Sequence, residues 1–132
     1  MNPSSLQWGV HHPLAELATI ADLDAALAGS VFRPILIFKH SATCGTSAMA
    51  HEEVDEWLAD STPPVDLFMV RIQSAREVSR AIADRLGIRH ESPQVLLVSG
   101  GRVLWHASHF RVTARSIAAA LAQHVPEPQL SR

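Results

Sequence analysis

Runs of consecutive apolar residues, each followed by polar turn residues, predict four strands in this chain. These runs lie at residues 35–38, 65–72, 94–98 and 102–105. The first lies between Pro34 and Lys39, and its lack of alternation is typical of a central strand buried on both faces. The last two are separated only by Ser99, Gly100 and Gly101, which predicts a β-hairpin.

Apolar residues at helical spacing predict four helices around these strands. The helical segments lie at residues 19–29, 44–58, 74–87 and 113–125. The pairs Thr19/Asp22 and Ser74/Glu77 have the spacing of capping boxes, which marks the starts of the first and third helices. The remaining predicted caps are Thr43 or Ser41 for the second helix, Thr113 for the fourth, and Gly29 and Gly87 as C-terminal stops.

The order helix, strand, helix, strand, helix, hairpin, helix predicts an α/β fold. A strand–helix–strand unit implies a parallel pair with a right-handed crossover, and the hairpin adds antiparallel strands. We therefore expect a mixed sheet of four or five strands with helices on both faces. The domain should span residues 19–125, preceded by a weakly patterned segment 1–18 with room for a short strand near Trp8 and Val10, and followed by a frayed tail 126–132.

Composition narrows the class of protein without identifying it. A chain of 132 residues with 47% apolar and 18% charged residues is typical of one soluble domain. The net charge of -2 gives no reason to expect nucleic acid or a membrane as partner. No apolar run approaches the roughly 20 residues of a membrane span, and no signal peptide is visible. With a single cysteine in the chain, these features predict a cytoplasmic protein.

That cysteine, Cys44, is the leading candidate for chemistry. It follows a predicted strand and a polar turn, and it opens the second predicted helix. A thiolate is the reactive form of cysteine, a free thiol titrates near pH 8.5, and a helix N-terminus favours the anion. Ser47 stands where the second cysteine of a Cys-x-x-Cys pair would lie, so the chain cannot close a disulfide within itself. The Ser47 hydroxyl can still donate to a thiolate.

The neighbours of Cys44 favour a reactive thiol over an inert one. Lys39, His40, Thr43 and Thr46 lie close in sequence and can also stabilise its thiolate. The alternative is that Cys44 is a small buried hydrophobe, the commonest state of a free cysteine. The polar surroundings weigh against that alternative, because an inert cysteine usually has apolar neighbours.

A second candidate element is the dipeptide Ser92–Pro93 before the third strand. Its peptide bond is either cis in a tight turn, where the backbone can pair with a peptide-like ligand, or trans at the start of an edge strand. Of the eight histidines, His106 and His109 bracket two small residues after the fourth strand. No histidine spacing matches a zinc motif, and one cysteine cannot build a structural zinc or iron–sulfur site alone, so we expect no metal.

Several motifs, taken together and in order, closely resemble the monothiol bacilliredoxin-like family known as YtxJ, which has a thioredoxin fold. The motifs are 38–41, Thr43–Cys44, Ser47, Met49–Ala50, 79–83, 87–94 and 105–109. They span about residues 20 to 122. The resemblance implies that Cys44 is the redox centre and that Pro93 is the cis-proline of this fold, with Ser92 beside it at the substrate. Supporting roles are expected from motif position alone for Lys39, His40, Thr43, Ser47, His90 and His109.

The resemblance implies a thiol–disulfide oxidoreductase that removes a low-molecular-weight thiol, with bacillithiol as co-substrate, from mixed disulfides on client proteins. Its expected partners are these thiolated clients, the small thiol and a reductase. Two alternatives stay open. The protein could be a passive thiol acceptor that protects without turnover. It could also carry an iron–sulfur cluster, because Cys44 to Ser47 is superficially like the Cys-Gly-Phe-Ser motif of monothiol glutaredoxins.

Overall fold

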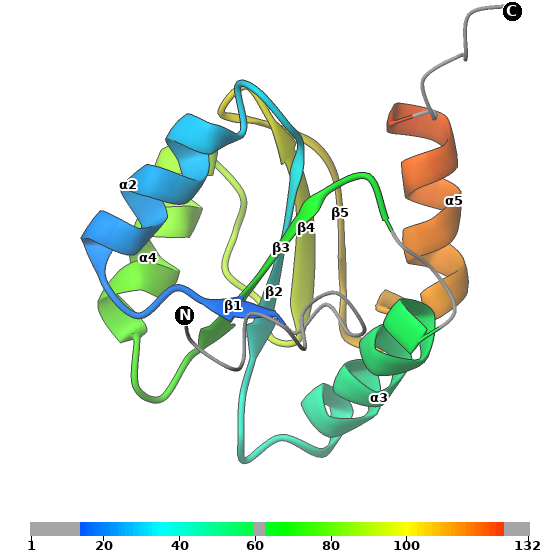
Figure 1. The fold of residues 1–132 in the computed structure, drawn as a ribbon. Coiled ribbons are helices and arrows are strands. Elements are labelled where there is room, and N and C mark those ends of the chain that lie inside the picture. The colour runs from blue at the N-terminus through cyan, green and yellow to red at the C-terminus, as the bar shows by residue number, and fades with distance from the viewer. Residues whose placement is uncertain (1–13, 60–62, 126–132) are drawn as a thin grey trace, which may run out of the picture.

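The computed structural model describes residues 14–59 and 63–125, which form a five-stranded mixed sheet between two pairs of helices (Figure 1). The elements are β1 (Ala15–Glu16), α2 (Ile20–Gly29), β2 (Ile35–His40), α3 (Gly45–Ala59), β3 (Asp66–Arg71), α4 (Arg76–Leu86), β4 (Gln94–Ser99), β5 (Arg102–Ser108), the 3-10 turn η1 (His109–Arg111) and α5 (Ala114–His124). Helices α2 and α4 cover one face of the sheet, and α3 and α5 cover the other. The predicted α/β fold is confirmed.

The strand order is β1-β3-β2-β4-β5, which places β2 at the centre. As predicted, β2 pairs with β3 in parallel, and β4 and β5 form an antiparallel hairpin. Strand β1 lies within the segment that we predicted to be weakly patterned, and it pairs with β3. The possible strand near Trp8 and Val10 and the tail 126–132 lie outside the described residues. Within the described part of the chain, no helix is long and apolar enough to cross a membrane.

Strand β2 is buried along its whole length and runs two residues beyond the predicted strand. Leu36 and Phe38 point into the core beneath α3 and α5, whereas Ile35 and Ile37 point into the core beneath α2 and α4. Residues 39 and 40 continue this alternation and pair with β3. Because both are polar, the hydropathy pattern hid them. Strand alternation sends their side chains to opposite faces, immediately before the turn that leads to Cys44.

Strand β5 also runs further than predicted, to Ser108 instead of residue 105. Its last residues pair with the start of β4, as in the register Gln94↔Ser108. The sequence hid this extension because the apolar run ends at Trp105 and only Ala107 is buried among the three residues that follow. A two-residue turn at Gly100 and Gly101 connects β4 to β5. Its φ values of 60° and 77° suit glycine. The longer β5 delivers η1 to the loop that contains Pro93.

The predicted helix signals have mixed outcomes. Thr19 and Thr113 cap α2 and α5, and Gly87 ends α4 in the left-handed conformation, all as predicted. The predicted capping box at Ser74 is wrong, because α4 begins one residue later, after Ala75, and its N-terminus has no side-chain cap. The Ser74 and Ala75 N–H groups both donate to the carbonyl of residue 71, so this tight turn precedes the helix.

Candidate functional site

Cys44 lies at the N-terminus of α3, directly before its first helical residue. Its carbonyl accepts the N–H of Ala48 at 3.1 Å, so Cys44 itself is the cap residue, and the prediction of Thr43 or Ser41 is wrong. Sulfur takes the place that a serine or aspartate oxygen usually fills at this position. It accepts hydrogen bonds from the backbone N–H groups of Ser47 and Thr46.

These contacts lower the pKa of Cys44 below its ordinary value. The largest cause is the backbone N–H of Ser47, followed in the same direction by the backbone of Thr46 and by both hydroxyl groups, while partial burial acts in the opposite direction. Each of these donors strengthens when sulfur carries a negative charge. The first turn of α3 contains no acidic residue that would oppose the anion. The arrangement therefore favours a nucleophilic thiolate.

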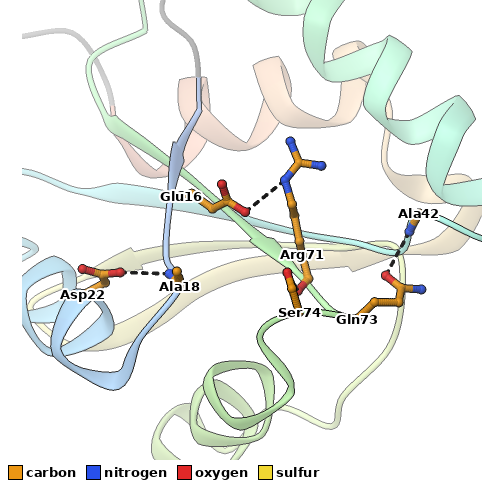
Figure 2. A network of polar contacts seen from close by, with 7 residues as sticks. All are labelled: Glu16, Ala18, Asp22, Ala42, Arg71, Gln73 and Ser74. Atoms are coloured by element: carbon orange, nitrogen blue, oxygen red, sulfur yellow. Dashed lines mark hydrogen bonds and ion pairs between the residues drawn. The ribbon is translucent and has the colours of Figure 1, made fainter. Parts of the chain in front are cut away.

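The loop that presents Cys44 is held by Gln73, which follows β3. The Gln73 amide oxygen accepts the N–H of Ala42 at 3.1 Å (Figure 2). The Gln73 amide nitrogen donates to Ser41 Oγ at 2.7 Å and to Thr43 Oγ1 at 3.2 Å. Gln73 is a site residue that the sequence motifs did not predict. The one signal for it was its position after a strand parallel to β2, because carboxyl ends of parallel strands share a sheet edge.

Ser47 joins α3 to the loop that contains Ser92 and Pro93. Its side chain is fully buried, and its Oγ accepts the N–H of Ser41 at 3.2 Å and lies 3.4 Å from Ser92 Oγ. The Ser92–Pro93 peptide bond is cis, which decides between the two alternatives that the sequence left open. The Pro93 carbonyl accepts the N–H of His109 at 2.8 Å. The structure thus links Cys44 through Ser47 to the loop that contains Ser92 and Pro93.

Further contacts hold the loop 89–93 along its length. Gln94 Nε2 donates to the Arg89 carbonyl at 3.0 Å and lies 3.4 Å from Ser108 Oγ. The Ser108 hydroxyl is also the largest cause that lowers the pKa of Glu91. Together with the contacts of Ser92 and Pro93, these bonds fix the segment that faces the thiol.

Lys39 lies on the other face of the sheet, away from α3. It is the only lysine in the chain and is completely buried. Its Nζ donates to the Ser79 carbonyl at 3.1 Å and lies 3.2 Å from His90 Nδ1. Burial lowers the pKa of Lys39 from 10.5 to about 8. Lys39 is not among the groups that shift the pKa of the Cys44 thiol.

His40 points toward α3, where its ring centroid lies 5.0 Å from that of His51. Burial, and then the positive charges of His51 and Arg71, lower the pKa of His40, while a contact with the Ser47 backbone acts in the opposite direction. His40 is therefore held neutral beneath the helix that carries Cys44. Its Nδ1 has no hydrogen-bond partner among the described residues.

His109 lies at the entrance to η1 with a left-handed φ of 57°. Beside it, a hollow between α3 and η1 is lined by residues that include Thr46, Met49 and Phe110. Phe110 is 74% exposed and Met49 56% exposed, so an apolar surface borders the thiol site. In the described part of the chain, no group of three or more histidine, cysteine or acidic side chains is arranged to hold a metal ion.

The sheet order, the thiol at the N-terminus of α3 and the cis-proline loop beside it define a protein of the thioredoxin fold. Solved structures agree. One, described as a candidate oxidoreductase with a thioredoxin fold, has a TM-score of 0.72 and 27% identity over 85% of this chain and 94% of its own. Thioredoxin from Fasciola hepatica has a TM-score of 0.68 and 20% identity, covering 84% of this chain and 99% of its own. Thioredoxin f2 from Chlamydomonas reinhardtii has a TM-score of 0.68 and 14% identity, covering 88% and 100%.

A family model described as monothiol bacilliredoxin BrxC matches residues 15–117. The chain therefore belongs to the monothiol bacilliredoxin family, which confirms the resemblance seen in its motifs. Fold and family together assign it a thiol redox function.

Proposed function

We propose that this protein is a monothiol thiol–disulfide oxidoreductase that removes bacillithiol from mixed disulfides on client proteins. The observation that carries the proposal is the position of Cys44 sulfur, where backbone N–H groups of Thr46 and Ser47 donate to it and lower the pKa of Cys44. An activated thiol that has no second cysteine in its chain suits chemistry that ends on a mixed disulfide. A free thiol of this kind suits a reducing compartment, so we place the protein in the cytoplasm.

In the first step, the Cys44 thiolate attacks the bacillithiol sulfur of a client mixed disulfide. A sulfur–sulfur bond forms between Cys44 and bacillithiol, the original disulfide bond breaks, and the client cysteine leaves as a thiolate that takes up a proton from water. Two sulfur atoms are joined before and after the step, so no external oxidant or reductant is needed. The client is thereby restored to its free thiol.

In the second step, a bacillithiol thiolate attacks the bacillithiol sulfur that is bound to Cys44. Bacillithiol disulfide forms and Cys44 leaves as its thiolate, which the same backbone donors stabilise. A partner reductase carrying a thiol can perform the equivalent attack. The second thiol must come from outside, because Ser47 occupies the position from which a resolving cysteine would act.

Ser92 and Pro93 are the proposed substrate-binding residues. The Ser92 hydroxyl lies 3.4 Å from that of Ser47, whose N–H donates to the Cys44 sulfur. This contact supports a role for the backbone of residue 92 in pairing with a disulfide held in line with the thiol. The exposed side chains of Met49 and Phe110 offer apolar contact to the client around the disulfide.

The direct test uses a reporter protein that carries bacillithiol on one exposed cysteine. After incubation, mass spectrometry should find bacillithiol on Cys44 and a free thiol on the reporter. The Cys44→Ser variant, which retains a helix cap, is the matched control and should take up none. Absence of the adduct under conditions in which an authentic bacilliredoxin reacts would refute the proposal. Release of no more than one reporter thiol per Cys44, even when free bacillithiol is added, would instead identify a passive acceptor without turnover.

A further inference from the structure

The burial of Lys39 needs an explanation, because an ammonium group is costly to remove from water unless it is paired. No part of Lys39 is exposed, and its Nζ reaches the Ser79 carbonyl on α4 and the Nδ1 atom of His90. Ser79 Oγ lies 3.2 Å from the same Nδ1 atom. The charge is therefore paired with acceptors on α4 and on the loop before Pro93.

The chemistry of this contact fixes the state of His90. An ammonium group has three protons and no acceptor, so it must donate to Nδ1, which leaves the proton of the neutral ring on Nε2. Burial and then the charge of Lys39 lower the pKa of His90, while the charge of Glu91 acts in the opposite direction. Lys39 and Glu91 are the charged groups that act on this ring. His90 is thus held as a neutral acceptor toward β2.

We propose that Lys39 is a positioning residue that holds the loop 89–93 in place through His90, and thereby keeps Ser92 beside the Cys44 helix. The hydrogen-bonding contacts of Lys39 are with α4 and with the loop before Pro93, so we expect it to act on that loop and not on the thiol. Its catalytic consequence rests on the proposed function, whereas its effect on the loop does not. Replacing Lys39 should loosen the loop and leave the thiol pKa unchanged.

Amide hydrogen exchange, measured by NMR, separates this role from a general contribution to packing. The His109 N–H donates to the Pro93 carbonyl and reports on the loop, while the Leu17 N–H donates to the Met69 carbonyl and reports on the far edge of the sheet. In Lys39→Met we expect exchange at His109 to become roughly tenfold faster, the size expected from losing one charge-assisted hydrogen bond, with Leu17 unchanged. Ile37→Val alters packing on the same face of β2 and should leave the exchange rates of both His109 and Leu17 unchanged.

Two substitutions at His90 test the direction of the hydrogen bond. In His90→Asn, the side-chain oxygen can replace Nδ1 as the acceptor, so His109 exchange should remain close to that of the unsubstituted protein. In His90→Leu, the acceptor is lost and the variant should resemble Lys39→Met. Combining Lys39→Met with His90→Leu should give no more than either change alone, because both remove the same contact.

The functional readout compares transfer with thiol reactivity. In Lys39→Met, uptake of bacillithiol from the reporter protein should fall roughly tenfold, while the pH midpoint of Cys44 alkylation stays the same. Equal acceleration of exchange at His109 and Leu17, or failure of His90→Asn to behave better than His90→Leu, would overturn the role of Lys39. If the unsubstituted protein takes up no bacillithiol, the proposed function fails, and the exchange at His109 still decides the role of Lys39.

Discussion

The buried amine of Lys39 predicts an unusual dependence of stability on alkaline pH. Its pKa is about 8 in the folded protein against 10.5 for an ordinary lysine. Between these values the unfolded chain binds more protons than the folded one, so the free energy of unfolding rises with pH. The destabilising effect of the buried charge is fully present below about pH 8 and is lost as the pH approaches the unfolded pKa.

The size of the effect follows from the two pKa values. Going from about pH 7 to about pH 10, the linkage relation gives a rise of about 2.5 kcal/mol in the free energy of unfolding. Lys39→Met removes the titrating group and should flatten this rise. The chain simplifies the comparison, because it has no other lysine and no tyrosine, and both proteins can carry Cys44→Ser to eliminate thiol titration.

Urea unfolding followed by tryptophan fluorescence at several pH values measures the difference, because Trp57 is buried in the core and should change its emission on unfolding. Carbon-13 labelling at lysine Cε provides an independent check, since the single lysine should give one resonance that titrates near pH 8. Two unfolding curves that run parallel from about pH 7 to about pH 10 would refute the reasoning. A lysine midpoint close to that of a free side chain would do the same.

Three further predictions concern the thiol, its loop and the core. Ser47→Ala should raise the pKa of Cys44, because it removes a hydroxyl donor, and alkylation rate against pH should show a higher midpoint; an unchanged midpoint would contradict the assigned contact. Gln73→Leu should slow bacillithiol uptake by loosening the Cys44 loop and should change the urea-derived free energy of unfolding by no more than about 1 kcal/mol, so a loss of several kcal/mol would indicate a mainly structural role. Phe38→Ala should lower the free energy of unfolding by about 3–5 kcal/mol, and a much smaller loss would mean that the core can collapse around the cavity.

The parts of the fold that depend on local patterns were predictable from the sequence. Thr19 and Thr113 could be predicted as helix caps, because a cap depends only on that residue and on the first turn of the helix that follows it. The apolar run of β2 identified the central strand, since burial on both faces leaves no alternation. Ser74 shows the limit of this reasoning. The same residue spacing also occurs in a tight turn. Here the N–H groups of Ser74 and Ala75 donate to the Arg71 carbonyl in such a turn.

Contacts between distant segments were not predictable in the same way. Gln73 acts on the Cys44 loop only because β2 and β3 end at the same edge of the sheet. The direction of Lys39 was equally hidden, because a strand that is apolar on both faces gives no sign of which residue faces which side. Its motif position suggested a role near the thiol. In the structure its ammonium group lies 3.2 Å from His90 Nδ1, in the loop before Pro93.

The end of β2 therefore contacts both sides of the proposed reaction site, the loop that would bind the disulfide and the helix that carries the thiol. Lys39 reaches the loop that carries Ser92, while the next residue, His40, packs on the other face against the helix that carries Cys44. Successive residues of one buried strand cannot shift independently, because each is paired with β3. Strand β2 thus contacts both the loop that carries Ser92 and the helix that carries Cys44. That arrangement suits a protein whose single cysteine must meet a disulfide in one fixed alignment and then wait for an external thiol.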